Sequence, residues 1–134
     1  MFKKIDHIGV AVKDLDEAVR LYRDVFGLKL LEIEEVESQK VKVAKFDIGG
    51  VHIELLQPTA DDSPIKKFID KKGEGLHHIA YEVDDIEEQL SQLKQKGVKL
   101  INERPTEGSS NTLIAFLHPK SSIILTELVF KGEK

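Results

Sequence analysis

The chain contains two copies of one sequence pattern, and this internal repeat constrains its fold more than any other feature. Residues 5–17 read IDHIGVAVKDLDE and residues 76–88 read LHHIAYEVDDIEE, at an offset of 71 residues. Residues 26–31, FGLKLL, match residues 96–101, KGVKLI, at an offset of 70. A period of about half the chain indicates two copies of one structural unit rather than a solenoid of many.

Each copy begins with a predicted strand and continues into a predicted helix. In the strand, bulky apolar residues alternate with a histidine and small residues, which is typical of one packed face and one open face. In the first copy, Asp14 and Glu17 have the spacing of a capping box, so a helix is expected to begin there and to end at Gly27. The second copy repeats these signals from Asp85 to Gly97.

Three strand-like runs follow each helix, which makes each copy a βαβββ module. The fold class is therefore predicted as α+β, with two modules paired around a shared cleft in a single domain over residues 1–134. Module one covers about residues 1–57 and module two about 76–130, joined by a linker at 58–75 with a short helix at 64–72. The runs are residues 28–36, 40–48 and 51–57, with Gly49-Gly50 as a hairpin turn, and residues 98–103, 111–117 and 122–130, with 118–121 as the matching turn.

Composition narrows the chemistry that such a cleft can perform. The 134 residues include no cysteine, which excludes disulfides, thiolate metal sites and a cysteine nucleophile. The formal net charge is −4 and no basic stripe is interleaved with aromatic residues, so we expect no nucleic-acid partner. No apolar run approaches the ~20 residues of a membrane span, so we expect no membrane partner. With no targeting segment in view, we expect a cytoplasmic location.

Two histidines and two glutamates occupy equivalent places in the two copies. His7 and His78 lie on the first predicted strands, and Glu54 and Glu127 lie between apolar residues on the last ones. Buried carboxylates are costly unless they are paired or bound to a metal. A two-fold pairing of the modules would bring the four side chains to one point. Two imidazoles and two carboxylates suit a divalent first-row metal ion with open positions for a substrate, so the cleft is predicted to contain a metal.

The remaining histidines carry weaker signals. His77 points to the opposite face from its neighbour and is interpreted as structural or as support for a ligand. His52 shares the side of the last strand that bears the glutamate, and it either supports that residue or faces solvent. His118 lies in a turn that either holds an anion or a thioester tail or is simply a turn. The lysines between residues 66 and 72 are predicted to form a solvated face.

Six short stretches, in order along nearly the whole chain, carry a family resemblance. They are DHIGVAV at 6–12, IELLQP at 53–58, DSPI at 62–65, GLHHIAYEV at 75–83, FLHPK at 116–120 and LTEL at 125–128. With the paired βαβββ modules, they resemble the vicinal oxygen chelate (glyoxalase/bleomycin resistance) superfamily and, within it, the methylmalonyl-CoA epimerases. The resemblance implies that one divalent ion (Co, Zn, Ni or Mn) is bound by His7, Glu54, His78 and Glu127. It also implies an acyl-CoA thioester as substrate, and homodimers are common enough that we expect one here.

The reaction that this resemblance implies is epimerisation by removal of the proton alpha to the thioester, through a metal-stabilised enolate. Glu127 is expected to serve as both metal ligand and catalytic base. The family often has glutamine where Glu54 stands, and some members place a second catalytic carboxylate at the position of Val43. The second acid/base is therefore unassigned, with Glu35 and Glu37 as candidates near that strand.

Two alternatives use the same cleft. A glyoxalase I-type lactoylglutathione lyase would use the same four ligands to move a proton between adjacent carbons of a glutathione hemithioacetal. A second glutamate at position 54 suits that pattern equally well. Other members of the superfamily sequester drugs without catalysis, but they lack the metal ligands that this chain carries.

Overall fold

The computed structural model describes residues 1–132, which divide into two compact units. We call His7–His77 the first unit, and Met1–Asp6 together with the chain from His78 onward the second unit. Strand β1 (Phe2–Ala11) contributes to both, because the boundary falls between Asp6 and His7. Each copy of the repeat follows the order strand, helix and three further strands, so the predicted α+β class is confirmed.

Four strands of the first unit lie in the order β2-β3-β4-β1. Strands β2 (Lys29–Val36), β3 (Val41–Ile48) and β4 (Val51–Pro58) are antiparallel neighbours, and β4 runs parallel to β1. Gly49 and Gly50, with φ angles of +61° and +85°, form the turn between β3 and β4. Both angles lie in the left-handed region that a two-residue hairpin turn of this kind requires, so the turn prediction is confirmed.

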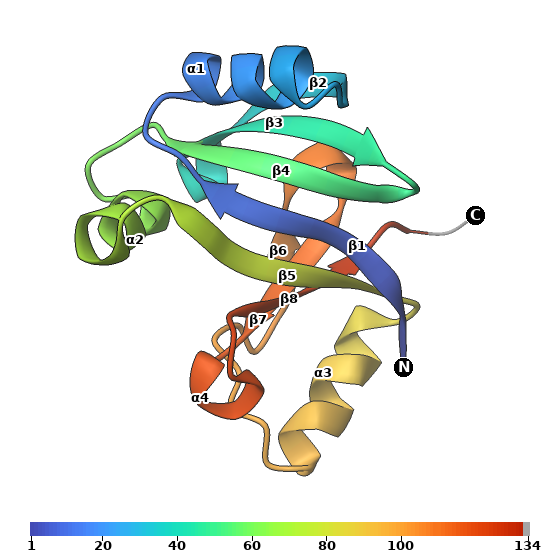
Figure 1. Ribbon diagram of the computed structural model, residues 1–134. Coiled ribbons are helices and arrows are strands. Elements are labelled where there is room, and N and C mark those ends of the chain that lie inside the picture. The colour runs from blue at the N-terminus through green and yellow to red at the C-terminus, as the bar shows by residue number, and fades with distance from the viewer. Residues whose placement is uncertain (133–134) are drawn as a thin grey trace. The chain divides into compact units, whose positions relative to one another are not determined.

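The two faces of these strands pack against different helices. Helix α1 (Leu15–Arg20), which continues into a π-helical turn (Leu21–Val25), covers the face that contains the fully buried Phe46 and Leu55. Figure 1 shows α1 lying beside β3. Helix α2 (Pro64–Lys72) lies where a short helix was predicted, and it covers the other face through Ile65 and Ile69. That face also bears His7 and Glu54.

The second unit repeats the arrangement. Its strands lie in the order β5-β8-β7-β6, with β5 (Gly75–Val83) parallel to β8 (Thr126–Phe130) and β7 (Leu113–Leu117) antiparallel to it; β6 (Thr106–Glu107) pairs with β7. Helix α3 (Ile86–Gln95) packs Ile86 and Leu90 against Leu117 and Leu128. A four-residue helix, α4 (Pro119–Ser122), precedes β8.

Both helices of the repeat begin as the capping-box signals predict. The Asp14 carboxylate accepts a hydrogen bond of 3.1 Å from the Glu17 backbone N–H, and Asp85 does the same for Glu88 at 3.1 Å. Each bond satisfies one of the N–H groups that the first turn of a helix leaves without an intrahelical partner. The two helices differ at their C-terminal ends, because α3 is α-helical throughout, without the π-helical turn of the first copy.

Two strand predictions in the second copy are wrong. Residues 98–103 form only a single bridge, between Leu100 and Leu117, because the Asn102 side chain accepts the Phe116 backbone N–H at 2.8 Å and interrupts the ladder. The strand predicted from residue 122 begins at Thr126, because the turn before it is the short helix α4 and Ile123 then adopts a φ of +76°. Among the residues described, no helix has the length and apolar character needed to cross a membrane.

Candidate functional site

His7 and Glu54 lie together in the first unit. Strand pairing places Gly9 of β1, which has no side chain, directly beside Glu54 of β4. His7 Nδ1 is 3.4 Å from Glu54 Oε2, and the two side chains are only 6% and 8% exposed. The predicted first histidine–glutamate pair is therefore in contact and is buried.

His78 and Glu127 form the equivalent pair in the second unit. Here the small residue beside the glutamate is Ala80, which pairs with Glu127 across β5 and β8. His78 Nε2 is 2.8 Å from Glu127 Oε1, with exposed fractions of 5% and 6%. The Phe116 ring lies edge-on to the His78 ring at 5.7 Å and fixes one side of it.

The chemistry of these donors fits a divalent metal ion. Each pair offers one imidazole nitrogen and one carboxylate, and both ligand types suit Zn, Co, Ni and Mn. Carboxylates that are this deeply buried are costly without a cationic or hydrogen-bonding partner. Each unit thus holds one buried half of the ligand set that the sequence predicted.

A buried lysine beside the first pair escaped the sequence analysis. Lys45 of β3 pairs directly with Glu54 of β4 in the antiparallel register, so both side chains point to the same face. The Lys45 side chain is 6% exposed, and Nζ lies 3.4 Å from Glu32 Oε2 and 3.8 Å from Glu34 Oε1. A sequence signal did exist: Lys45 has the same parity along its strand as the buried Val41 and so belongs to the inward face.

The strand register places the glutamates near β2, among them the candidates for a second acid/base, on different faces of the sheet. Glu35 pairs with Lys42 and therefore shares the face that α1 covers, away from His7 and Glu54. Glu34 pairs with Val43 and points to the opposite face. Glu37 lies in a short 3₁₀ turn after β2. The face that bears the first pair thus carries Glu34 and Lys45 rather than Glu35.

The remaining histidines have structural contacts. The His77 ring packs edge-on against the Phe68 ring at 4.8 Å, as the structural interpretation of this residue predicted. His118 Nδ1 accepts a hydrogen bond of 3.0 Å from the Lys120 backbone N–H and so caps α4. His52 lies opposite Asp47 in the register of β3 and β4 and is half-buried.

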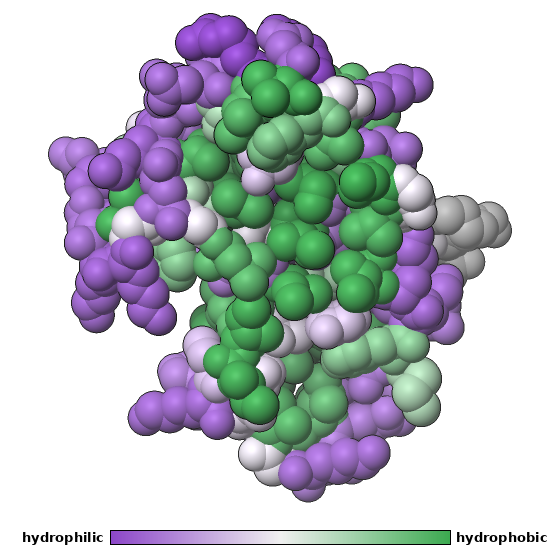
Figure 2. All heavy atoms as spheres, in the orientation of Figure 1, coloured by the Kyte–Doolittle hydropathy of each residue, from purple (hydrophilic) through white to green (hydrophobic). Residues whose placement is uncertain are grey.

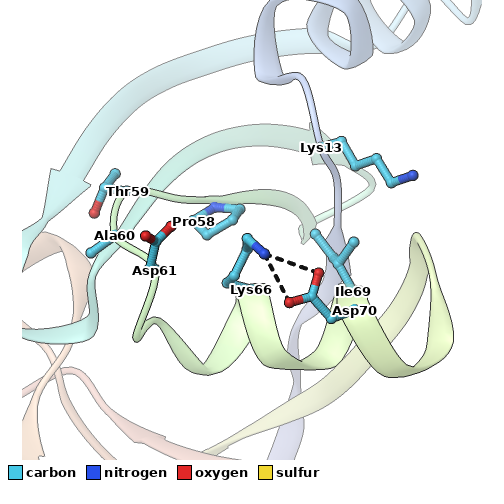
Figure 3. Close-up of a pocket in the computed structure, with 8 residues that line it drawn as sticks. All are labelled: Lys13, Pro58, Thr59, Ala60, Asp61, Lys66, Ile69 and Asp70. Atoms are coloured by element: carbon cyan, nitrogen blue, oxygen red, sulfur yellow. Dashed lines mark hydrogen bonds and ion pairs between the residues drawn. The ribbon is translucent and has the colours of Figure 1, made fainter.

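A hollow of about 430 Å³ lies beside α2 in the first unit (Figure 3). Its charged lining residues are Lys13, Asp61, Lys66 and Asp70, so positive and negative groups alternate around it. Lys66 donates hydrogen bonds of 2.8 and 3.0 Å to Asp70, and this contact raises the pKa of the Lys66 ammonium above its usual value. Lys66 is half-buried, whereas Lys67, Lys71 and Lys72 of the same helix are exposed, as expected for a solvated face.

Comparison with known proteins gives a family match. Residues 6–116 match the Glyoxalase/Bleomycin resistance protein/Dioxygenase superfamily. The uncharacterized protein YqjC of Bacillus subtilis is 44% identical over 93% of this chain and 90% of its own length. The ethylmalonyl-CoA/methylmalonyl-CoA epimerase of Cereibacter sphaeroides is 34% identical over 90% of this chain and 91% of its own.

A solved structure extends this likeness to the fold. The structure of a methylmalonyl-CoA epimerase in complex with methylmalonyl-CoA and NH4+ is 38% identical in sequence, with a TM-score of 0.94. It covers 98% of this chain, and this chain covers 96% of it. The predicted vicinal oxygen chelate fold is therefore confirmed.

Proposed function

Because the chain belongs to the Glyoxalase/Bleomycin resistance protein/Dioxygenase superfamily, we propose that it is a metal-dependent methylmalonyl-CoA epimerase. One observation carries the proposal: a buried histidine–glutamate pair occurs in the same strand context in both copies of the repeat. The likeness to epimerases in both sequence and structure supports the choice of reaction.

In this proposal His7, Glu54, His78 and Glu127 bind one divalent ion, whose Lewis acidity stabilises the negative charge that develops on the thioester oxygen. Without such stabilisation, the proton alpha to a thioester is far too weakly acidic for a carboxylate base. The ion is Co, Zn, Ni or Mn, and the substrate is an acyl-CoA thioester with a carboxylate on the reacting carbon. We place this activity in the cytoplasm.

The glutamates of the two pairs have different roles in the proposed reaction. Glu127 removes the alpha proton, because a carboxylate of moderate basicity beside the stabilised charge can act as a general base. Its 2.8 Å contact with His78 holds it in one orientation within a dry environment. Glu54 serves as a ligand only, so an amide oxygen at that position preserves the function.

Proton exchange tests the proposal directly. The protein, loaded with one equivalent of metal, is incubated with each epimer of methylmalonyl-CoA in D2O, and deuterium uptake at the alpha carbon is followed by NMR. We expect uptake that a chelator abolishes. Glu127→Gln is expected to lose epimerisation, whereas the matched Glu54→Gln variant in the other copy retains it. Wild-type epimerisation by Glu127→Gln would remove this residue from the mechanism.

The same samples discriminate the alternatives. The four-ligand set with glutamate at position 54 also suits a lactoylglutathione lyase, so the glutathione hemithioacetal of methylglyoxal is assayed in parallel. Metal-loaded protein that turns over the hemithioacetal but exchanges no proton of methylmalonyl-CoA would replace the epimerase with the lyase. Protein that cannot be loaded with any of the four ions would favour drug sequestration.

We further propose that the protein is a homodimer, associating through an apolar patch on the first unit. We assign to this patch the exposed residues Leu21, Val25 and Phe26 at the end of the first helix and Leu31 and Ile33 of β2. Figure 2 shows apolar side chains gathered at the surface in the region of α1. Exposed apolar side chains grouped in this way are typical of protein–protein contact surfaces.

A further inference from the structure

His118 carries a hydrogen-bond donor that the fold leaves unused. Its Nδ1 atom accepts the Lys120 backbone N–H at 3.0 Å, which caps the short helix α4. A ring nitrogen that accepts a hydrogen bond has no proton, so the neutral imidazole carries its proton on Nε2. Among the residues that the structure describes, none accepts a hydrogen bond from Nε2. The cap therefore fixes the tautomer and leaves Nε2–H, in a half-buried residue, available to a ligand.

Strand register places His118 on the face of the second unit that bears Glu127. Phe116 of β7 lies directly opposite Glu127 of β8, so the two side chains point to the same face. His118 is two residues beyond Phe116, and its φ and ψ angles of −73° and 135° keep the chain extended there. Alternate residues of an extended chain point to one side, so His118 shares this face and lies about 7 Å farther along it.

A carboxylate, an aromatic ring and a donor therefore follow one another along this face. Glu127 is the proposed base, the partly buried Phe116 is apolar, and His118 provides Nε2–H. The first unit lacks this order. There Lys45 lies opposite the glutamate, and the residue two places farther along the strand is Asp47, whose ionised carboxylate can only accept hydrogen bonds. The order of groups is thus specific to the second copy.

The thioester arm of coenzyme A has a matching order of groups. From the reacting carbon it runs through the thioester carbonyl, the sulfur and two methylenes to an amide. The carbonyl carbon of that amide is six bonds from the reacting carbon, which equals two residues of extended backbone, or about 7 Å. The step from Phe116, opposite Glu127, to His118 has the same length. An acidic carbon, an apolar segment and a hydrogen-bond acceptor thus match the base, the ring and the donor.

We propose that His118 binds the thioester arm of the substrate, an inference that rests on the proposed function. With the reacting carbon beside Glu127, the two methylenes lie against the Phe116 ring, and Nε2–H of His118 donates a hydrogen bond to the first amide carbonyl of the arm. His118 takes no part in proton transfer. It holds the reacting carbon in place beside the base and selects thioesters that carry an amide at this distance.

Two variants separate the donor of His118 from its capping role. In His118→Asn the side-chain oxygen takes the place of Nδ1 and still caps α4, but no donor reaches the position of Nε2. In His118→Gln the longer side chain places an amide N–H near that position and loses the cap. The matched control is Asp85→Ala, which removes the cap of α3 in the same unit and leaves His118 unchanged. Circular dichroism and metal content show that each variant is folded and loaded.

The assay compares three methylmalonyl thioesters: that of coenzyme A, that of N-acetylcysteamine, which keeps the amide, and the ethyl thioester, which lacks it. For His118→Asn we expect kcat/KM for epimerisation to fall about 10-fold with the first two, the contribution of one hydrogen bond, and to stay within about twofold with the ethyl thioester. His118→Gln and Asp85→Ala are expected to stay within about threefold of wild type with all three. Where a thioester is not turned over, its inhibition constant against methylmalonyl-CoA gives the same comparison.

A second measurement needs no substrate. Proton–nitrogen NMR of the histidine rings in the metal-free protein should show that neutral His118 carries its proton on Nε2, because Nδ1 accepts the Lys120 N–H. A proton on Nδ1 instead would overturn the proposal, since Nε2 would then have nothing to donate.

Two results of the assay would also overturn the role of His118. One is an equal loss with all three thioesters in His118→Asn, which would assign the residue to structure alone. The other is an unchanged kcat/KM of His118→Asn with methylmalonyl-CoA. Failure of the proposed function looks different, because then the wild-type protein itself epimerises none of the three thioesters, and the inference falls with it.

Discussion

Replacement of His78 by alanine tests whether the glutamate of the second pair depends on its histidine for burial. The substitution removes the imidazole that Glu127 contacts at 2.8 Å and leaves a carboxylate that is 6% exposed. Leaving a buried acceptor without its hydrogen-bonding partner costs about 1–3 kcal/mol. For a domain of this size that corresponds to a melting temperature roughly 3–15 °C lower.

The measurement is urea unfolding of the metal-free protein, with a chelator present so that metal binding does not contribute. The matched variant is His7→Ala in the first copy, where the corresponding contact is longer, at 3.4 Å. We expect a smaller loss there, because that distance lies outside the usual range of a hydrogen bond. In a double-mutant cycle, His78→Ala and Glu127→Gln should show a coupling free energy of about 1–3 kcal/mol. A loss below about 1 kcal/mol for His78→Ala, with no coupling, would refute the reasoning.

Three further predictions concern metal, assembly and folding. Binding of one divalent ion per chain should raise the free energy of unfolding by about 2.7 kcal/mol when the free ion concentration is about 100-fold above its Kd. Urea titration with and without a chelator measures this difference. If none of the four ions stabilises the protein, the metal site is contradicted. Phe26→Asp, which places a charge in the exposed apolar patch, should convert a dimer to a monomer in light scattering, and a variant that remains dimeric would exclude the patch. Asp85→Ala removes the cap of α3 and should lower the free energy of unfolding in urea by about 1 kcal/mol, with activity retained. A decrease below about 0.3 kcal/mol would show that water replaces the cap.

The sequence predicted those parts of the fold whose signals are local and repeated. The caps at Asp14 and Asp85 were predictable because a capping box is recognised from two residues three positions apart. The turn at Gly49-Gly50 was predictable because glycine readily adopts the positive φ angles that a two-residue hairpin turn requires. The prediction for residues 98–103 was wrong because a single side chain, Asn102, replaces a backbone partner in the ladder. A side-chain oxygen that takes the place of a backbone acceptor does not change the hydrophobic periodicity of the segment, so this break in the strand could not be predicted from the periodicity.

The part of the candidate site that occurs in both copies of the repeat could be predicted from the sequence. His7 with Glu54 and His78 with Glu127 were found because the same residue types recur in register. Lys45 was missed because a comparison of the two copies identifies only the residues that both copies share, and the copies differ at the position of Lys45. Its parity with Val41 was the available signal, but a lysine in a strand is ordinarily taken to face solvent.

The π-helical turn at Leu21–Val25 makes the surface of the first copy of the repeat different from that of the second. It accounts for the one residue by which the repeat offset falls from 71 to 70, because a π turn holds an extra residue while the helix continues. The turn ends in Val25 and Phe26, which are 72% and 56% exposed, whereas the second copy has Gln95 and Lys96 at these places. Among the described residues, these two exposed apolar side chains therefore occur in one copy of the repeat only. If the proposed dimer uses them, a self-complementary contact present once per chain would close at two chains, whereas one on each copy would let association propagate into a filament.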